Sequence, residues 1–286
     1  MTVLEVIQRS AEFLARKGVE TPRLQAELLL AHVLSCPRLK LYLNFERELA
    51  ASELDSIREL VRRRGNREPL QYVVGSASFC GLEMKVTPAV LIPRPETEVL
   101  AERAWTFLAG LGPGSPGVLD FGAGSGCLAI VLAARCARVR ITALEASAEA
   151  LAVARENAAQ HGVTERIRFV HGDTLAAAAG MPFHLIVANP PYIPSGQLAE
   201  LEPEVRDHEP RLALDGGADG LDVIRHLAAH AATVLHPAGR LMLEFGDGQA
   251  AVVGAVFEAE GWRVEAIVND LAGRPRHLVA ALGART

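Results

Sequence analysis

The sequence predicts an α/β protein in which a mostly parallel sheet is covered by helices on both faces and preceded by a small helical domain. From Val118 onward, short apolar runs alternate repeatedly with helical stretches. Before residue 69, apolar residues recur instead at the spacing of amphipathic helices. We therefore expect an N-terminal helical bundle in residues 1–68, a β-hairpin linker in 69–90 and an α/β domain in 91–286.

The composition limits the classes of function. The chain has 286 residues, half of them hydrophobic, and a net charge of −5, which does not favour direct binding of nucleic acid. Its four cysteines form no CxxC pair, so we expect no metal site and a reducing cytoplasm. The chain shows no signal-peptide pattern and no apolar run of the ~20 residues needed to cross a membrane. We expect a monomer.

Two helices stand out in the N-terminal region. Thr21-Pro22 resembles a helix cap followed by proline, and Leu24, Leu28 and Ala31 should then face the core. A second helix opens at Ser52, and its inward residues should be Leu54, Ile57, Leu60 and Val61. Arginines gather at its end, at positions 58, 62–64 and 67, where basic charge opposes the helix dipole. The sequence is compatible with two roles for these arginines, a solvated helix face and a docking surface for a partner.

The linker and the first helix of the α/β domain follow. Residues 72–74 and 82–86 are apolar or alternating and flank a Gly-containing turn, which predicts a β-hairpin. A helix should then run from the 91–98 segment to Leu108, before a loop rich in Gly and Pro at 110–117. Seven strands are expected beyond it, at 118–121, 140–144, 167–170, 185–188, 241–245, 262–268 and 277–281.

A glycine loop follows the first of these strands. It comprises Gly122, Ala123, Gly124, Ser125 and Gly126, preceded by Asp120, and a helix begins at Cys127. Glycines let a ligand approach the bare backbone. Glu145 lies about 20 residues further on, after the second strand, where an acid can bind both hydroxyls of a ribose. The pattern predicts a nucleoside cofactor.

Two kinds of nucleoside cofactor fit this loop, a dinucleotide and S-adenosylmethionine (SAM). Gly124, Gly126 and Ala129 match a dinucleotide fingerprint. Asp120, however, would repel a pyrophosphate if it pointed into the site, and it suits the amino group of SAM. After the third strand, Asp173 and Thr174 are candidates for contact with adenine, although Asp173 could equally form an Asx-turn.

The fourth strand ends in Asn189, Pro190, Pro191 and Tyr192. Two prolines prevent the strand from continuing, and ligands bind at this end of the strands in open α/β sheets. The Asn189 side-chain oxygen and the Pro190 carbonyl can accept both protons of a planar NH2 group, with an aromatic ring beside it. Together with the glycine loop, this corner favours SAM, and the sequence predicts transfer of its methyl group to an amino or amide nitrogen.

These segments together resemble the HemK/PrmC family, the N5-glutamine methyltransferases of peptide-chain release factors. The similarity extends over most of the chain, through segments at 91–98, 122–126, 189–193, 209–214, 216–221, 243–246 with Gln249, and 270–273 with Arg276. The resemblance implies a Rossmann-like class I SAM-dependent methyltransferase domain with a substrate-docking N-terminal domain. Glu145 in place of the commoner Asp, and Thr174 in place of a larger apolar residue, depart from the family pattern, as do Phe121 and Ala123 in the loop.

The resemblance implies a role for each motif. The 122–126 loop would contact the methionine part of SAM, Glu145 the ribose, and Asn189 both the cofactor and the glutamine of a release-factor Gly-Gly-Gln motif. No Ser/His/Asp or Cys/His cluster is apparent near these motifs, so catalysis should depend on positioning by Asn189, Pro190 and Tyr192. Three alternatives remain: a ribosomal-protein glutamine methyltransferase, an adenine-amino DNA or RNA methyltransferase, and a nucleoside-binding module without catalysis.

Overall fold

The structure is a computed structural model that describes residues 1–178, 180 and 182–283. The chain divides into two compact units. The first contains Met1–Ser76 together with Glu202–His208, and the second contains Ala77–Leu201 and the chain from Glu209 onward. The first unit therefore includes a short segment that the sequence analysis assigned to the α/β domain.

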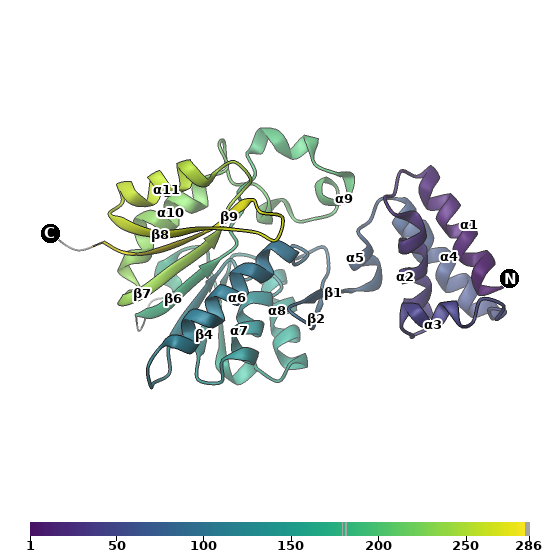
Figure 1. Ribbon diagram of the computed structural model, residues 1–286, viewed down its shortest axis with the longest axis horizontal. Coiled ribbons are helices and arrows are strands. Elements are labelled where there is room, and N and C mark those ends of the chain that lie inside the picture. The colour runs from purple at the N-terminus through teal and green to yellow at the C-terminus, as the bar shows by residue number, and fades with distance from the viewer. Residues whose placement is uncertain (179, 181, 284–286) are drawn as a thin grey trace. The chain divides into compact units, whose positions relative to one another are not determined.

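The first unit is helical (Figure 1). Its helices are α1 (Val3–Arg16), α2 (Pro22–Val33), α3 (Arg38–Tyr42), α4 (Ala51–Gly65), α5 (Leu70–Val74) and, from the inserted segment, α9 (Pro203–Arg206). A capping box starts α1, because the Thr2 hydroxyl accepts from the Glu5 N–H and the Glu5 carboxylate accepts from the Thr2 N–H. Val3, Ile7, Leu29, Leu30 and Ile57 belong to one buried apolar cluster, which makes this unit a small domain with its own core.

Two expectations for this region were wrong. Leu24 is 40% exposed, because the face of α2 that packs inward carries Leu29 and Leu30 instead. Residues 72–74 are helical and not a strand: Pro69 precedes α5, Gly75 ends it at φ +83°, and Tyr72 and Val73 are buried. Packing overrides the β-propensity of the Tyr-Val-Val run here. The hairpin begins later, with β1 (Ser76–Phe79) and β2 (Leu82–Lys85).

The arginines at the end of α4 are paired with carboxylates. Arg62 bonds Glu59, and Arg63 bonds Glu68. Arg64, 5% exposed, and Arg67 both bind Glu204 of the inserted segment, at 2.7 and 2.6 Å. The cluster therefore anchors this unit internally, and its positive charge is largely compensated.

The second unit is a seven-stranded sheet covered by helices on both faces (Figure 1). Its strands are β3 (Gly117–Phe121), β4 (Arg140–Glu145), β5 (Ile167–His171), β6 (Phe183–Ala188), β7 (Leu235–Glu244), β8 (Trp262–Asn269) and β9 (Pro275–Leu282). The helices of this unit are α6 (Pro95–Gly110), α7 (Cys127–Arg135), α8 (Ala148–Gln160), α10 (Asp222–His230) and α11 (Ala250–Ala259). Single 3-10 turns occur at 164–166, 175–178, 195–200, 211–213 and 231–233.

The spatial order of the strands is β5-β4-β3-β6-β7-β9-β8, and all neighbours are parallel except those of β9. The seven predicted strands are thus confirmed, each within a few residues except that β7 begins earlier, at Leu235. Alternate strand residues face two separate cores. Leu185 and Val187 pack toward the α6–α7 side, whereas Ile186 and Ala188 pack toward the α10–α11 side.

The strand order places the predicted site. The order reverses between β3 and β6, since β4 lies beside β3 on one side and β6 on the other. Phe121 pairs with Ala188 in the register, so the glycine loop after β3 and Asn189 after β6 begin side by side at the carboxyl edge of the sheet. In open α/β folds, ligands bind at such a point.

Candidate active site

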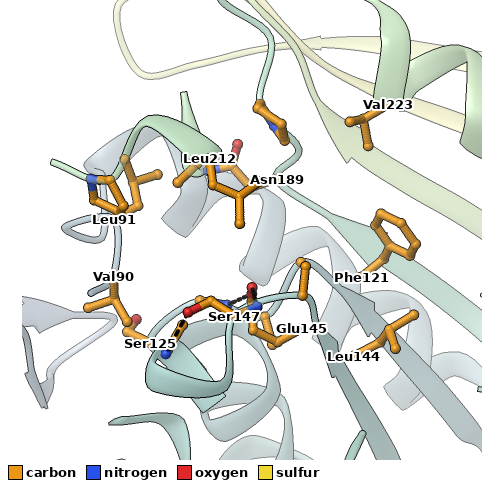
Figure 2. A pocket seen from close by; sticks show the side chains of 18 of the residues that line it. Val90, Leu91, Phe121, Ser125, Leu144, Glu145, Ser147, Asn189, Leu212 and Val223 are labelled. Atoms are coloured by element: carbon orange, nitrogen blue, oxygen red, sulfur yellow. Dashed lines mark hydrogen bonds between the residues drawn. The ribbon is translucent and has the colours of Figure 1, made fainter. Parts of the chain in front are cut away.

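A cavity of about 550 Å³ opens at this point of the sheet. It is lined from the ends of β3, β4, β5 and β6, by residues before and within α6, and by the segment from Pro210 to His226. Figure 2 shows Glu145 and Ser147 on one side of the cavity and Asn189 on the opposite side, with Val90 and Leu91 at one end and Phe121 and Val223 at the other. The volume is in the range of small-molecule sites.

The glycine loop has the conformation that only glycine adopts without strain. Gly122, Gly124 and Gly126 have φ of +74°, +55° and +79°. At Gly122 and Gly124, both on the cavity wall, an added Cβ would have no neighbour within 4 Å, so the bare backbone faces open space. At Gly126 a Cβ would come within 3.0 Å of the Ala154 Cβ, so that glycine serves packing between loop and α8.

Glu145 holds the glycine loop in place. One carboxylate oxygen accepts from the Gly124 N–H at 2.8 Å, and the other accepts from the Ser147 N–H at 2.9 Å. Glu145 is only 8% exposed, and it lines the cavity. Each carboxylate oxygen can accept a second hydrogen bond, so Glu145 can brace the loop and still bind a ribose diol.

Asp120 lies beneath the loop and not on the cavity wall. It is 1% exposed, and one oxygen accepts from the Ala129 N–H at 3.0 Å inside α7. The other oxygen has no hydrogen-bond partner. Burial raises the pKa of Asp120 to about 7. The structure therefore does not place this carboxylate where it would meet a cofactor amino group, as the sequence suggested.

Asn189 is held by a hydrogen-bonded chain that leads to a buried carboxylate. Its Nδ2 donates to the Thr97 hydroxyl at 3.0 Å, and Thr97 donates to Glu244 Oε2 at 2.7 Å. The Tyr192 hydroxyl donates to the other oxygen of Glu244 at 3.3 Å, and Arg276 donates to the Tyr192 oxygen at 3.1 Å. Thr97 is 2% exposed and Glu244 fully buried. Burial raises the pKa of Glu244 to about 7 and that of Tyr192 to about 12.

The structure brings most of the predicted site residues to one cavity. The predicted residues on its wall are Gly122, Ala123, Gly124, Ser125, Glu145, Asp173, Asn189 and Pro191. Gly126, Thr174, Pro190 and Tyr192 are not on the wall. Pro190 is buried, Thr174 is exposed, and the Tyr192 hydroxyl is turned toward Glu244. The Tyr192 ring, expected beside the substrate NH2 group, therefore does not line the cavity.

Sequence reasoning gave no role to Thr97, Glu244 or Arg276. Each belongs to a segment that carries the family resemblance, but none stands beside the glycine loop or the Asn-Pro-Pro-Tyr corner in the sequence. One signal was available for Glu244. It is a charged residue at the end of the apolar run Leu241–Leu243, and a charge in that position is rarely buried without a partner.

The cysteine on the cavity wall is poorly suited to act as a nucleophile. Burial raises the pKa of Cys127, on the cavity wall, to about 12, so its thiol stays protonated near neutral pH.

Within the described part of the chain, no group of three His, Cys, Asp or Glu residues could hold a metal ion. The described helices include none that is long and apolar enough to cross a membrane. The polar groups on the wall suit binding and positioning.

Strand order, glycine loop and the acid after β4 together define a class I SAM-dependent methyltransferase domain. Comparison with known proteins agrees. Residues 5–75 match the PrmC N-terminal domain family, and residues 106–201 match the methyltransferase small domain family. A ribosomal protein L11 methylase from Lactobacillus delbrueckii subsp. bulgaricus shares the fold with a TM-score of 0.50 at 22% identity, over 67% of this chain and 80% of that one.

Curated relatives with a named activity define the family more narrowly. The chain is 45% identical to the release factor glutamine methyltransferase of Geobacter sulfurreducens, over 91% of this chain and 90% of that protein. It is 48% identical to the release factor glutamine methyltransferase of Chlorobaculum tepidum, over 88% of each chain. The chain belongs to the family of release factor glutamine methyltransferases.

Proposed function

We propose that this protein transfers the methyl group of SAM to the side-chain amide nitrogen of the glutamine in the Gly-Gly-Gln motif of peptide-chain release factors. The observation that carries the proposal is the position of Asn189. Its carboxamide lines the same cavity as the glycine loop, at the end of the neighbouring strand, in a chain of this family. An Asn oxygen is a suitable acceptor for the N–H of a substrate amide.

The residues on the wall fit SAM. The open backbone of Gly122 and Gly124 would receive the methionine part, and the Glu145 oxygens would accept from the ribose hydroxyls. Asp173, two residues after β5, would accept from the adenine amino group. None of these contacts involves a phosphate, which agrees with the surplus of carboxylates around the loop. Bound SAM supplies an electrophilic methyl group whose leaving group is a neutral thioether.

The protein's task is to make a poor nucleophile reactive, because the lone pair of an amide nitrogen is delocalised into its carbonyl. Asn189 Oδ1 would accept one N–H of the glutamine amide. The other N–H would reach the backbone carbonyl of the next residue, Pro190, although Pro190 itself is buried and does not line the cavity. That orientation aims the lone pair at the methyl carbon and stabilises the positive charge that develops on nitrogen. The nitrogen then releases one proton to water, so no dedicated base is required. Tyr192 would support the corner from behind through its bond to Glu244.

We further propose that residues 1–68 dock the release factor and that residues 69–90, which contain α5 and the β1–β2 hairpin, link them to the methyltransferase domain of residues 91–286. The protein would act in the cytoplasm as a monomer and without direct contact to nucleic acid. The absence of a surplus of basic residues supports the last point, since the net charge is −5.

The test is a methylation assay with SAM labelled in the methyl group. The full chain is incubated with a purified release factor, with the same factor carrying Gln→Ala in its Gly-Gly-Gln motif, with ribosomal protein, and with DNA or RNA. We expect label only in the intact release factor. Equal label in the substituted factor would contradict the proposed target. Label in ribosomal protein or nucleic acid alone would assign the alternative functions, and no transfer at all would favour a binding module.

A further inference from the structure

A buried hydrogen-bonded relay controls how the Asn189 carboxamide is turned. It runs from Asn189 Nδ2 to the Thr97 hydroxyl and from that hydroxyl to Glu244 Oε2, over 3.0 and 2.7 Å. Thr97 comes from α6 and Glu244 from the end of β7, so the relay joins two elements that are far apart in the sequence. Thr97 has no role in the positioning scheme described above, and Glu244 enters it only as the partner of Tyr192.

The direction of the relay follows from the chemistry of its members. When Glu244 is ionised, its carboxylate can only accept hydrogen bonds, so the single hydroxyl proton of Thr97 points to Glu244. The Thr97 oxygen is then left as an acceptor, and the NH2 of Asn189 donates to it. An Asn side chain whose NH2 is held in this way has its Oδ1 free to face the cavity. A reversed Asn189 would instead place two acceptors against each other at 3.0 Å.

We propose that Thr97 and Glu244 are positioning residues that fix Asn189 with its oxygen, and not its NH2 group, toward the substrate amide. This inference rests on the proposed function and names two residues that act through Asn189. A glutamine side chain presents both a donor end and an acceptor end. The fixed oxygen selects the NH2 end and thereby brings the nitrogen, and not the carbonyl oxygen, to the methyl group.

The same carboxylate also secures the other end of the corner. Tyr192 donates to Glu244 Oε1, and Arg276 lies with its guanidinium carbon 5.3 Å from the centre of the Tyr192 ring. Both ends of the Asn-Pro-Pro-Tyr run are therefore attached to one buried group, Asn189 through Thr97 and Tyr192 directly. This explains why a carboxyl group is present at the end of the apolar run Leu241–Leu243, where its burial is costly.

Two substitutions at Thr97 separate the relay from mere packing. Thr97→Val keeps the shape but cannot accept from Asn189 or donate to Glu244, whereas Thr97→Ser keeps the hydroxyl. The matched control is Thr106→Val on the same helix, where an exposed threonine hydroxyl bonds only the Glu102 carbonyl. Methyl transfer to the release factor is measured for each at varied concentrations of factor and SAM.

We expect kcat to fall about 10- to 100-fold in Thr97→Val, with KM for the release factor and the Kd of SAM within about 3-fold of wild type. Thr97→Ser should recover kcat to within about 5-fold of wild type, and Thr106→Val should not change it. Thermal melting checks that each variant is folded. Equal kcat in Thr97→Val and Thr106→Val would overturn the proposal, and so would an equal loss in Thr97→Ser and Thr97→Val.

A second measurement does not depend on activity. The chain has five asparagines, at positions 44, 66, 157, 189 and 269, so selective ¹⁵N-Asn labelling gives few side-chain NH2 signals, and Asn189→Ala identifies the one of interest. We expect this signal to move and to exchange faster with water in Thr97→Val, but not in Thr97→Ser. An unchanged signal would refute the relay even in an active enzyme. A changed signal in a protein that does not methylate release factors would refute the proposed function and leave the relay standing.

Discussion

The carboxylate of Glu145 accepts a hydrogen bond of 2.8 Å from the backbone N–H of Gly124, which joins the acid after β4 to the middle of the glycine loop. Its other oxygen accepts from the Ser147 N–H at 2.9 Å. The residue expected to bind the ribose is thus also the residue that shapes the loop. Removing it should affect the cofactor twice, through the lost contact and through the loosened loop.

Glu145→Ala should therefore weaken SAM binding at least about 10-fold, equivalent to about 1.4 kcal/mol. The two backbone N–H groups that it leaves without a partner should also lower the free energy of unfolding by about 1–3 kcal/mol. Calorimetric titration with SAM and urea unfolding measure the two effects. Glu165→Ala, at an exposed site in the turn before β5, is the control. Unchanged SAM affinity in Glu145→Ala would remove the ribose assignment.

Asn189→Ala tests the centre of the proposed mechanism. The change removes an acceptor that would contact the substrate in the transition state, and loss of a comparable oxyanion-hole donor costs about 2.7–4 kcal/mol, or about 10²–10³ in kcat. SAM affinity should change much less, since the cofactor has its own contacts on the opposite wall. Single-turnover methylation and calorimetry separate the two. Asn269→Ala, exposed at the end of β8, should behave as wild type, and near-normal turnover of Asn189→Ala would contradict its role.

The activity should depend on the protonation of Glu244. Burial raises its pKa to about 7, and the groups that face it are Thr97 and Glu96 on α6, Tyr192 after β6, and Arg276 and His277 on β9. Burial lowers the pKa of His277 to about 4, so this imidazole is neutral near pH 7. A protonated Glu244 can donate to Thr97 and so no longer enforces the direction of the relay.

We therefore expect log kcat of the wild type to rise with pH through about 7 and then to level. Glu244→Gln, whose amide can donate or accept, should have a lower kcat and should lose this rise. The measurement is kcat at saturating substrates from pH 5.5 to 9, with Thr106→Val as a control that keeps the profile. An identical rise in Glu244→Gln would assign the titration to another group.

How far the sequence predicts this structure depends on the distance over which each signal acts. The strands and the glycine loop are local patterns, with apolar runs and turn residues adjacent in the chain. The sequence predicts them within a few residues, except for the early start of β7 at Leu235. Residues 72–74 were predicted as a strand because Tyr and Val favour strands, but burial of Tyr72 and Val73 after Pro69 makes them helical. The Thr97–Glu244 bond joins residues 147 positions apart, and no local pattern encodes such a pair.

Asp120 gives a prediction for stability. Its pKa is raised from 3.8 to about 7, so between about pH 4 and pH 7 the folded protein keeps a proton that the unfolded chain has released. The contribution of Asp120 is thus fully present below about pH 4 and is lost as pH rises through about 7, with a slope of up to about 1.4 kcal/mol per pH unit. Histidines with lowered pKa values, such as His277, act in the opposite direction, so the difference between variants is the quantity to measure.

In Asp120→Asn this contribution is absent. Only the wild type loses stability at this site as pH rises from 5 to 7. The free energy of unfolding of the variant minus that of the wild type should therefore increase over this range, so the variant becomes relatively more stable. Urea unfolding at pH 5, 6 and 7 gives the difference at each pH. A difference that does not change with pH would show that Asp120 is ionised throughout the range.

Glu204 should hold the inserted segment to the first unit. Its carboxylate bonds both Arg64 and Arg67, and these bonds lower its pKa to about 2 despite burial, which acts to raise it. A depressed pKa means stabilisation that is present above about pH 4.5 and is lost as pH falls toward 2. Glu204→Gln removes the charge and leaves Arg64, 5% exposed, with neutral acceptors: the Gln25 side chain, the Glu68 carbonyl and the new amide oxygen at position 204.

We expect amide hydrogen exchange in residues 202–208 to become at least about 10-fold faster in Glu204→Gln at pH 7, with a loss of about 1–3 kcal/mol in the free energy of unfolding. The matched control is Glu202→Gln, because Glu202 is 76% exposed at its side chain and lies 3.5 Å from Arg67. This exposed pair should contribute little. Along the chain, the segment connects the Asn-Pro-Pro-Tyr corner with Pro210, which lines the cavity. Glu204→Gln should therefore also raise KM for the release factor more than it changes the Kd of SAM. Equal exchange in the two variants would mean that the segment is held by other contacts.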